Sequence, residues 1–374
     1  MKLCKKCVNP DTRPNIVFDE EGICPVCRYE EAKRKQAIDW DARDAELAEI
    51  VDWGKANTKS SYDCIVTVSG GKDSMRQAFY ARDELGLNVL LVSCVYPPEQ
   101  IHERGPANLA NLISHGFDTI TVSLNPQVWK SLMKLSFFKY SNWCRSTEMA
   151  LYAIPIHVAI AHKTPLIFLG ENPALTIGEK HGNLNGDASR MRYCNTLQGG
   201  DPSWLYGNGI GWKDLHFYGY PPEEDINHAD LRIIYLGYYI RDWCGSNNAE
   251  FAIERGLQIR EESPENTGDL WGFTGVDEDF RLVNQMIKYI KLGFGHVTDQ
   301  ACEAIADGRM TREEGIELVK KYDGKCAKKF INAFCEYLGI SHKEFWDVVE
   351  AARGLHIWEK GETGEWRLKC KELY

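Results

Sequence analysis

The chain has 374 residues, enough for two or three domains, and 44% of them are hydrophobic, as in a folded protein rather than a disordered one. The formal charge of −10 at pH 7 argues against a broad nucleic-acid-binding surface, although a local basic groove stays open. The amino terminus is charged with no apolar run behind it, and the longest apolar run, near 150–161, is broken by Pro155 and His157. We therefore expect a cytoplasmic protein with no secretory signal and no membrane-spanning segment.

Four cysteines mark the first 35 residues. Cys4 and Cys7 form one Cys-x-x-Cys pair, and Cys24 and Cys27 form a second. The chain has 13 cysteines and no export signal, which favours thiols and metal ligands over a disulfide framework. Two such pairs can hold zinc tetrahedrally, so residues 1–35 are predicted to form a zinc-ribbon head with a closed, structural metal site. Residues 36–58 carry apolar side chains at mostly helical intervals and predict a connecting helix.

The middle of the chain alternates strand-like and helix-like segments. Helical stretches near 73–86, 104–116, 126–138 and 147–162 alternate with four apolar runs, Cys64–Val68, Val89–Val95, Thr119–Leu124 and Leu166–Leu169. This alternation predicts an α/β fold with a mostly parallel sheet over residues 59–260. Residues 176–230 have weak periodicity, which is typical of a long binding loop. Residues 231–243 predict either one more strand or the start of a buried helix.

The carboxyl-terminal region, residues 261–374, is predicted to be mainly helical. Glycines lie at or near the breaks between five helical segments, which are Phe280–Leu292, Asp299–Ala306, Arg312–Tyr322, Ala327–Leu338 and His342–Ala352. The stretch His296-Val297-Thr298-Asp299-Gln300 stands at the start of the second segment, and Thr298 is a candidate for its helix cap.

The hexapeptide SGGKDS, residues 69–74, follows the first apolar run and opens a helical stretch. A Walker A loop would need Gly in place of Val66 and Ser or Thr in place of Asp73, so that motif is excluded. Ser69-x-x-Lys72 also matches a serine acylase signature, but the Ser-Asp-Asn and Lys-Thr-Gly elements of those enzymes do not occur. The remaining alternative to a binding site is an ordinary glycine-rich turn between a strand and a helix.

The residue types in this hexapeptide suit a phosphate group. The glycine pair lets the backbone approach an anion, the amides that open the next helix point at it, and the lysine and two serine hydroxyls add charge and donors. An aspartate beside so many donors suits a magnesium ligand better than a phosphate neighbour. We therefore predict a phosphate site formed by Ser69, Gly70, Gly71, Lys72, Asp73 and Ser74, with Asp73 as a ligand of Mg²⁺.

A strand followed by SGGKDS resembles the PP-loop of ATP pyrophosphatases. In that superfamily the loop grips the pyrophosphate of ATP while a substrate oxygen attacks the α-phosphorus, which gives an adenylylated substrate. The resemblance implies ATP and Mg²⁺ as cofactors and a sheet of that superfamily's type. Gly170, Glu171 and Asn172 follow the fourth apolar run, where the superfamily has a further nucleotide-contacting motif, so they are also candidates for nucleotide binding.

Nearly the whole chain resembles the N-acetyl sugar amidotransferases of bacterial surface-polysaccharide synthesis. Residues 4–27, SGGKDS and residues 288–324 carry the resemblance. It implies that an acetamido group becomes an acetamidino group, since adenylylation of the amide oxygen creates a leaving group that ammonia displaces as AMP. Catalytic roles are predicted for Lys72 and Asp73. Arg145 is a third catalytic candidate, as a phosphate contact, and a surface ion pair is an equal alternative for it.

A separate glutaminase is predicted to supply the ammonia. Lys2 stands where an amino-terminal-nucleophile glutaminase needs cysteine, and none of the cysteines lies in a Gly-x-Cys-x-Gly elbow. The main alternative function is a tRNA thiolase, which uses the same loop and cysteine pairs but conflicts with the acidic charge. A scaffold with a decayed nucleotide site is a further alternative, against which the intact loop argues.

Weaker candidates lie outside the loop. Cys144 and Cys194 are candidates for a sulfur-transfer pair, with packed thiols as the alternative. Aromatic residues between Trp204 and Tyr220 either stack on a sugar or belong to the core. Four basic residues of the long loop are candidates to close over a nucleotide or an acidic sugar: Lys180, His181, Arg190 and Arg192.

Overall fold

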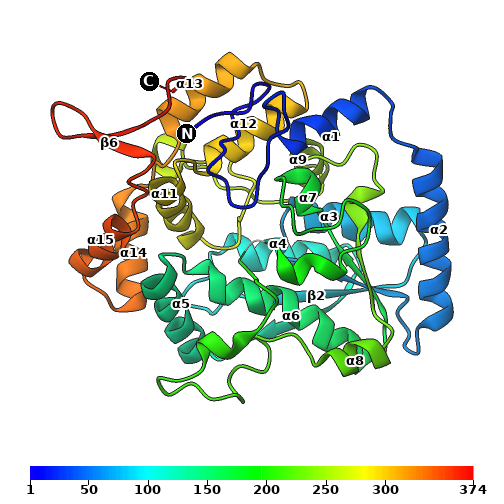
Figure 1. Ribbon diagram of the computed structural model, residues 1–374. Coiled ribbons are helices and arrows are strands. Elements are labelled where there is room, and N and C mark those ends of the chain that lie inside the picture. Colours follow the sequence, from blue (N-terminus) through cyan, green and yellow to red (C-terminus); the bar gives the residue numbers. More distant parts are fainter. Residues whose placement is uncertain (195, 374) are drawn as a thin grey trace.

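A computed structural model of the chain describes residues 1–194 and 196–373. Asn195, in the predicted loop 176–230, and Tyr374, at the end of the predicted carboxyl-terminal region, lie outside the described residues. The strands form a central sheet with helices on both sides, and the amino-terminal head lies against the carboxyl-terminal helices, at the top of Figure 1.

Five strands form the central sheet: β1 (Cys64–Thr67), β2 (Val89–Val95), β3 (Asp118–Ser123), β4 (Leu166–Leu169) and β5 (Arg232–Tyr235). Their order is β3-β2-β1-β4-β5, and every neighbouring pair is parallel. The predicted α/β fold is therefore confirmed, and of the two alternatives for residues 231–243 the strand is correct. The chain winds one way from β1 to β3 and then returns to the other side of β1, so β1 and β4 border the crevice where ligands of such sheets bind.

Helices cover both faces of this sheet. They are α2 (Trp40–Asn57), α3 (Lys72–Phe79), α4 (Arg104–Ser114), α5 (Pro126–Tyr140), α6 (Cys144–His162) and α9 (Gly245–Ile253). Successive strand side chains point to opposite faces. Ile65 and Ile167 join one apolar cluster with residues of α5 and α6, whereas Val66 and Phe168 join a second cluster with residues of α2, α3 and α9. Burial on both sides explains why β1, β2 and β4 are nearly continuous apolar runs, whereas the edge strand β3 is half exposed and alternates polar with apolar residues.

The carboxyl-terminal region contains the five predicted helices and a small hairpin. These elements are α11 (Phe280–Leu292), α12 (His296–Ala306), α13 (Arg312–Tyr322), α14 (Lys328–Leu338), α15 (His342–Ala351), β6 (Trp358–Lys360) and β7 (Trp366–Leu368). A third apolar cluster joins them to the head, which contains helix α1 (Pro25–Arg34), because Val8 and Ile23 pack with Val297 and Ala301 of α12. The Met1 amino group donates to the Lys369 carbonyl at 3.2 Å, so the amino terminus lies beside the segment that follows β7.

The predicted cap of α12 by Thr298 is wrong. Helix α12 begins at His296 with Gly295 as its N-cap, three residues before the predicted start. The Asp323 carboxylate, just after α13, accepts hydrogen bonds from the Gly295 and Val297 amides at 2.8 and 3.0 Å. The Thr298 hydroxyl donates to the same carboxylate at 2.6 Å. A side chain from another helix thus satisfies amides that are left open at a helix start.

The segment between β4 and β5 contains only short helices among its described residues. These are α7 (Pro173–Thr176), the 3-10 turns Ser189–Tyr193 and Pro202–Leu205, and α8 (Glu223–His228). Within residues 1–194 and 196–373, no helix combines the length and the apolar character needed to cross a bilayer.

Candidate functional site

The SGGKDS segment forms a tight loop at the carboxyl end of β1. Gly70 has φ +83°, and a Cβ added there would lie 3.2 Å from the Leu109 amide nitrogen, so both the backbone conformation and the space require glycine. Gly71 is the N-cap of α3, and the Ser74 hydroxyl donates to its carbonyl at 2.9 Å. The loop therefore turns directly into a helix whose first amides face the crevice beside β1.

Lys72 and Asp73 are joined at the start of α3. The Lys72 ammonium lies 2.5 Å from one carboxylate oxygen of Asp73, and the side-chain amide of Asn248 in α9 donates to the other at 2.8 Å. Burial acts to lower the pKa of Lys72, but the negative charges of Asp73, Glu303 and Glu171 outweigh it, so the pKa is raised and the ammonium stays charged. Asn248 is fully buried and fixes the Asp73 carboxylate from the opposite side.

The turn after β4 brings Glu171 to this pair. Desolvation of its carboxyl group, followed by the negative charge of Asp73, raises the pKa of Glu171 to about 7, although the residue as a whole is exposed. Asn172 has a different role, since its side chain accepts from the Ala174 amide and donates to the Asn183 and Asn185 carbonyls, each at 2.9 Å. Asn172 thus orders the following loop, while Glu171 faces the SGGKDS loop.

A cavity of about 290 Å³ lies at the carboxyl ends of β1 and β4, and we call it the loop cavity. Its polar lining includes Ser69, Asp73, Ser74, Gly170 and Glu171. The remaining wall is largely apolar, and it is formed in part by Val92, Leu151, Tyr152, Leu169, Met191 and Tyr235. Polar groups at one end and apolar side chains at the other suit a molecule with a charged part and a flat, apolar part.

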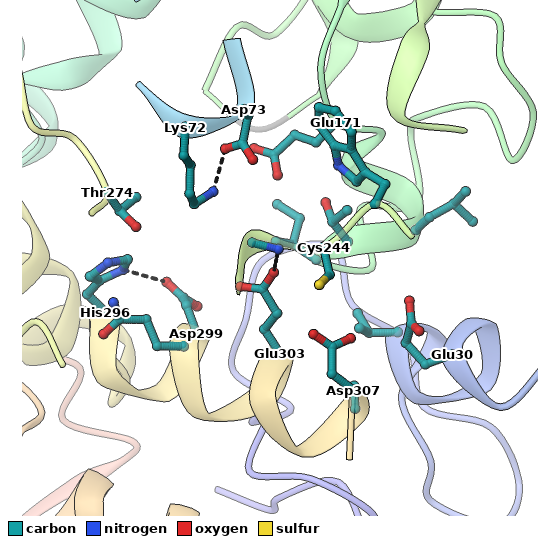
Figure 2. A pocket seen from close by; sticks show the side chains of 18 of the residues that line it. Glu30, Lys72, Asp73, Glu171, Cys244, Thr274, His296, Asp299, Glu303 and Asp307 are labelled. Atoms are coloured by element: carbon teal, nitrogen blue, oxygen red, sulfur yellow. Dashed lines mark hydrogen bonds and ion pairs between the residues drawn. The ribbon is translucent and has the colours of Figure 1, made fainter. Parts of the chain in front are cut away.

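A second cavity of about 220 Å³ lies between the loop, the head and α12, and we call it the acidic cavity. Figure 2 shows its carboxylates facing one another from four parts of the chain. Six carboxylates and two permanent cations line it: Glu30, Asp73, Glu171, Asp299, Glu303 and Asp307, with Lys72 and Arg281. Asp73 and Glu171 line both cavities, so the two spaces meet at this pair.

One face of α12 supplies much of this acidic lining. His296, Asp299, Glu303 and Asp307 recur at intervals of three or four residues, which places them on the same side of a helix, and Figure 2 shows all four on the side of α12 that borders the cavity. The Glu303 carboxylate accepts from the Gly245 amide at the start of α9. Helices α12 and α9 are thereby joined beside the SGGKDS loop.

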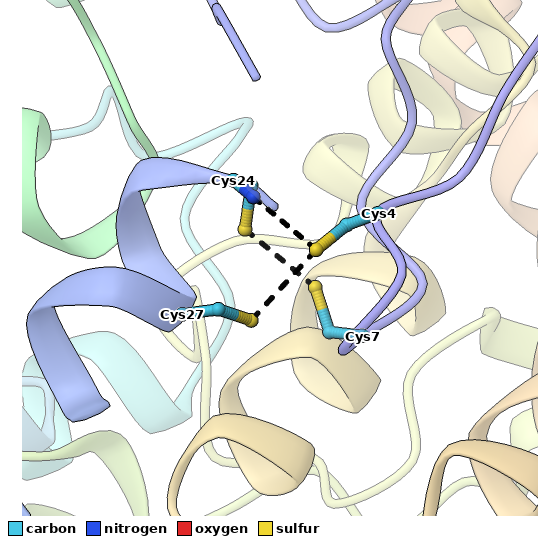
Figure 3. A group of neighbouring side chains, drawn as sticks. All are labelled: Cys4, Cys7, Cys24 and Cys27. Atoms are coloured by element: carbon cyan, nitrogen blue, oxygen red, sulfur yellow. Dashed lines mark hydrogen bonds between the residues drawn. The ribbon is translucent and has the colours of Figure 1, made fainter. Parts of the chain in front are cut away.

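The four head cysteines converge as predicted. Figure 3 shows the sulfurs of Cys4, Cys7, Cys24 and Cys27 pointing toward a common centre, and all four lie within 4.8 Å of one another. The Cys4–Cys27 and Cys7–Cys24 sulfur distances are 4.0 and 3.7 Å. Tetrahedral zinc with Zn–S bonds of about 2.3 Å requires sulfurs about 3.8 Å apart, so the donor set fits such an ion. All four ligand positions would come from protein, which is typical of a structural site.

The head is tied to the acidic face of α12 by partly buried ion pairs. Arg13 pairs with Asp299, whose carboxylate also lies 2.6 Å from the Lys288 ammonium. Burial acts to raise the pKa of Asp299, but the charges of Lys288 and Arg13 outweigh it and hold the pKa well below its usual range. The Arg312 side chain in turn donates to the carbonyls of Cys4 and Cys7. The cysteine cluster and the acidic cavity are therefore parts of one packed unit.

Other sequence candidates lie apart from both cavities. Arg145 stacks on the Tyr140 ring at 3.8 Å and donates to Gln198, and it lines neither cavity. Cys144 and Cys194 also line neither cavity, and burial raises the pKa of each thiol. The basic candidates of the long loop, Lys180, His181, Arg190 and Arg192, are likewise absent from both linings. The structure thus gathers the loop, Glu171 and Gly170, but leaves Arg145 outside this group.

Asn248 and Arg281 complete the site without any sequence signal of their own, and Glu303, which lies within residues 288–324, joins them. Each comes from a helix far from SGGKDS in the chain and reaches the loop only through packing. His296 and Asp299 belong to a stretch that the family resemblance singled out, which was the available signal for them.

The chain is an α/β protein with a parallel sheet, and SGGKDS lies at the end of β1, where the resemblance to the PP-loop predicts it. Residues 272–371 match the family described as "LPS biosynthesis protein WbpG-like, C-terminal domain". This region is therefore similar to a family of lipopolysaccharide biosynthesis proteins, in agreement with the resemblance carried by residues 288–324 of the sequence. A search among curated proteins gives no significant match.

Solved structures give distant similarities. The NMN synthetase from Francisella tularensis is 11% identical, with 60% of this chain and 99% of that chain covered, at a TM-score of 0.30. The NH3-dependent NAD synthetase from Campylobacter jejuni is 13% identical, with 60% of this chain and 100% of that chain covered, also at a TM-score of 0.30. The U34-tRNA thiolase NcsA from Methanococcus maripaludis is 13% identical, with 99% of this chain and 95% of that chain covered, at a TM-score of 0.32. TM-scores of this size support no inference about activity.

Proposed function

We propose that the chain is an ATP-dependent amidotransferase that converts the N-acetyl group of a sugar into an acetamidino group and releases AMP and pyrophosphate. The observation that carries this proposal is the meeting of the two cavities at Asp73 and Glu171. A reaction that first activates an oxygen with ATP and then admits a second reactant needs two adjoining spaces. The similarity of residues 272–371 to a family of lipopolysaccharide biosynthesis proteins supports a sugar as the acceptor.

ATP would occupy the loop cavity. Its base suits the apolar wall near Tyr152 and Met191, and its pyrophosphate suits the amides and hydroxyls of SGGKDS. The adjacent carboxylates of Asp73 and Glu171 are oxygen ligands of the kind that Mg²⁺ prefers, and a bound Mg²⁺ would neutralise charge on the phosphates. Lys72 would add positive charge where the leaving pyrophosphate develops negative charge.

The acceptor amide would enter from the side of the acidic cavity. An amide carbonyl is a weak electrophile, and transfer of AMP to its oxygen gives an imidate whose carbon ammonia can attack. The chain's own task in the first step is alignment of the amide oxygen with the α-phosphorus, which accelerates reaction without an enzymic nucleophile. The cysteine cluster would hold zinc in a purely structural role, and ammonia would come from a separate glutaminase.

A tRNA thiolase is the weaker alternative. Sulfur transfer needs a reactive thiolate near the activated base. The cysteines that line the cavities are Cys94 and Cys244, and burial raises their thiol pKa values to about 12 and about 11. Both are protonated at neutral pH, which disfavours that chemistry.

The experiment is to incubate the enzyme with Mg²⁺, ATP, ammonium and a panel of N-acetyl sugars, and to separate the nucleotides formed. We use N-acetylglucosamine, N-acetylgalactosamine and N-acetylmannosamine, each free and linked to UDP. The proposal expects AMP that depends on both a sugar and ammonium. Formation of ADP, or AMP formation that requires tRNA and a sulfur donor instead, would overturn it.

A further inference from the structure

His296 is a buried side chain without a hydrogen-bond partner, and it borders the acidic cavity. Only 6% of it is exposed, and among the described residues neither ring nitrogen has a hydrogen-bond partner. The nearest carboxylates lie too far for a hydrogen bond: Asp299 is 4.0 Å from Nδ1, and Asp269 is 4.0 Å from Nε2. A buried polar ring that is left open costs stability, so its retention calls for a functional explanation.

The charge of the acidic cavity defines what can enter it. Six carboxylates line it against Lys72 and Arg281. Arg13 and Lys288 already pair with Asp299, and the pKa of Glu171 is about 7, but the carboxylates of Glu30, Asp73, Glu303 and Asp307 still outnumber the two cations, so a small cation is attracted. The carboxylates on α12 form a line from Asp307 through Glu303 and Asp299 to His296 (Figure 2). An ammonium ion, the form in which ammonia mostly exists at neutral pH, has the charge and donors that this line would bind.

We propose that the acidic cavity is the site where ammonia reaches the activated substrate, and that His296 accepts the proton that the attacking nitrogen loses. This assignment rests on the proposed amidotransferase function. It gives the acidic face of α12 a role that the adenylylation step does not require.

The step balances as follows. The bound ammonium first releases one proton to solvent and becomes ammonia. The ammonia lone pair then forms a C–N bond to the carbon of the adenylylated amide, whose own nitrogen still carries its proton, and the electron pair of the C=N bond moves onto that sugar nitrogen. The result is a tetrahedral adduct in which the attacking nitrogen is positively charged. A ring nitrogen of His296 takes one proton from that nitrogen. The C–O bond to AMP then breaks with its electron pair on the phosphate oxygen, and the nitrogen lone pair forms the C=N bond of the amidinium product. AMP leaves, and the proton on His296 passes to solvent.

The surroundings of His296 suit a proton acceptor. Burial, followed by the charge of Arg281 on α11, lowers the pKa of His296, so the ring is neutral at pH 7. Asp299 on the same helix and Asp269 from the segment before α11 oppose this effect and would stabilise the protonated ring once it forms. Lys288 and Arg13 pair with Asp299 and keep that carboxylate charged.

The test compares wild type with His296→Asn, and uses His162→Asn at the exposed end of α6 as the matched control. Sugar-dependent exchange of label between pyrophosphate and ATP, without ammonium, reports adenylylation alone. Ammonium-dependent amidine formation reports the second step. Hydroxylamine serves as a second nucleophile, because its adduct is acidic enough to lose a proton to water.

His296→Asn is expected to keep the exchange rate while losing amidine formation by about 100-fold or more, the usual effect of a lost general base. Hydroxylamine should restore product formation in the variant. Unchanged amidine formation, or a parallel loss of exchange and amidine formation, would overturn the assignment. Absence of sugar-dependent exchange and of amidine in wild type would instead refute the proposed function.

A second measurement needs no sugar. The imidazole resonances of His296, assigned by comparison with His296→Asn, are followed by NMR during titration of the full chain with ammonium chloride and, separately, sodium chloride. The assignment expects a neutral ring at pH 7 that responds to ammonium and not to sodium. A charged ring, or the same response to both salts, would overturn it.

Discussion

Replacement of Asn248 tests the geometry that holds the SGGKDS loop in place. Its amide donates to Asp73 at 2.8 Å from a fully buried position, so Asn248→Ala leaves the carboxylate held by Lys72 alone. A hydrogen bond to a charged group contributes about 1.5–3 kcal/mol. If Asp73 helps to bind Mg-ATP, loss of this amount corresponds to about a 10- to 100-fold weaker affinity.

The assay is calorimetric titration of the protein with Mg-ATP, with thermal unfolding measured in parallel. Asn248→Asp keeps the side-chain volume but replaces the donor with an acceptor beside Asp73, so it should weaken binding at least as much as Asn248→Ala. Asn227→Ala, at an exposed position of α8, is the control. Affinity within twofold of wild type in both Asn248 variants, with the fold intact, would refute the assigned role of Asp73.

Three further predictions concern the loop, the carboxylate pair and the head. Gly70→Ala should cost about 1–2 kcal/mol of stability, because the backbone there is left-handed, and it should abolish ATP binding, because the added Cβ meets Leu109. The control is Gly86→Ala, at φ +60° in open space, which should leave ATP binding intact. ATP binding that survives Gly70→Ala and is lost in Gly86→Ala would contradict the loop assignment. Glu171 has a pKa raised from 4.5 to about 7, so its stabilising contribution is present below pH 4.5 and is lost as pH rises through 7. Urea unfolding without added Mg²⁺ should show a loss of stability between pH 5 and pH 8 in wild type that Glu171→Gln lacks. The loss should be about 1 kcal/mol or less, because Glu171 is more than a third exposed and solvent screens its charge. Glu20→Gln, at an exposed position, should behave as wild type, and an equal pH slope in Glu171→Gln would contradict the assigned shift. Cys24→Ser should remove bound zinc, as measured by elemental analysis, destabilise the chain by about 3 kcal/mol or more, and speed amide hydrogen exchange in α12. The control Cys326→Ser, outside the cluster, should keep its zinc. Full zinc content in Cys24→Ser would exclude the cluster as the zinc site.

Local sequence patterns predicted the sheet and the cysteine site. The runs that became β1, β2 and β4 are apolar because both faces of the sheet are buried there, and β3 shows the alternation of an edge strand; both patterns can be seen without knowing which strand lies alongside. The paired Cys-x-x-Cys spacing likewise reports a local geometry. Gly70 was predictable as a special position because its backbone conformation excludes other residues.

The acidic cavity could not be predicted in the same way. Its lining depends on α12 packing beside the SGGKDS loop, and the contacts that fix α12 come from distant parts of the chain, Arg13 in the head and Asp323 after α13. Nothing in the local pattern around Asn248 indicates that its amide faces Asp73. The wrong cap prediction has the same cause, since Thr298 has the right residue type but Asp323 satisfies the helix start from outside.

The central claim is the exchange of an amide oxygen for nitrogen at the site where the two cavities meet. Mass spectrometry of the sugar recovered after incubation with Mg²⁺, ATP and isotope-labelled ammonium tests it most directly. The account predicts a product with one oxygen replaced by labelled NH, in amounts equal to the AMP formed. A sugar recovered unchanged while AMP accumulates with both sugar and ammonium present, or a product without the label, would contradict it.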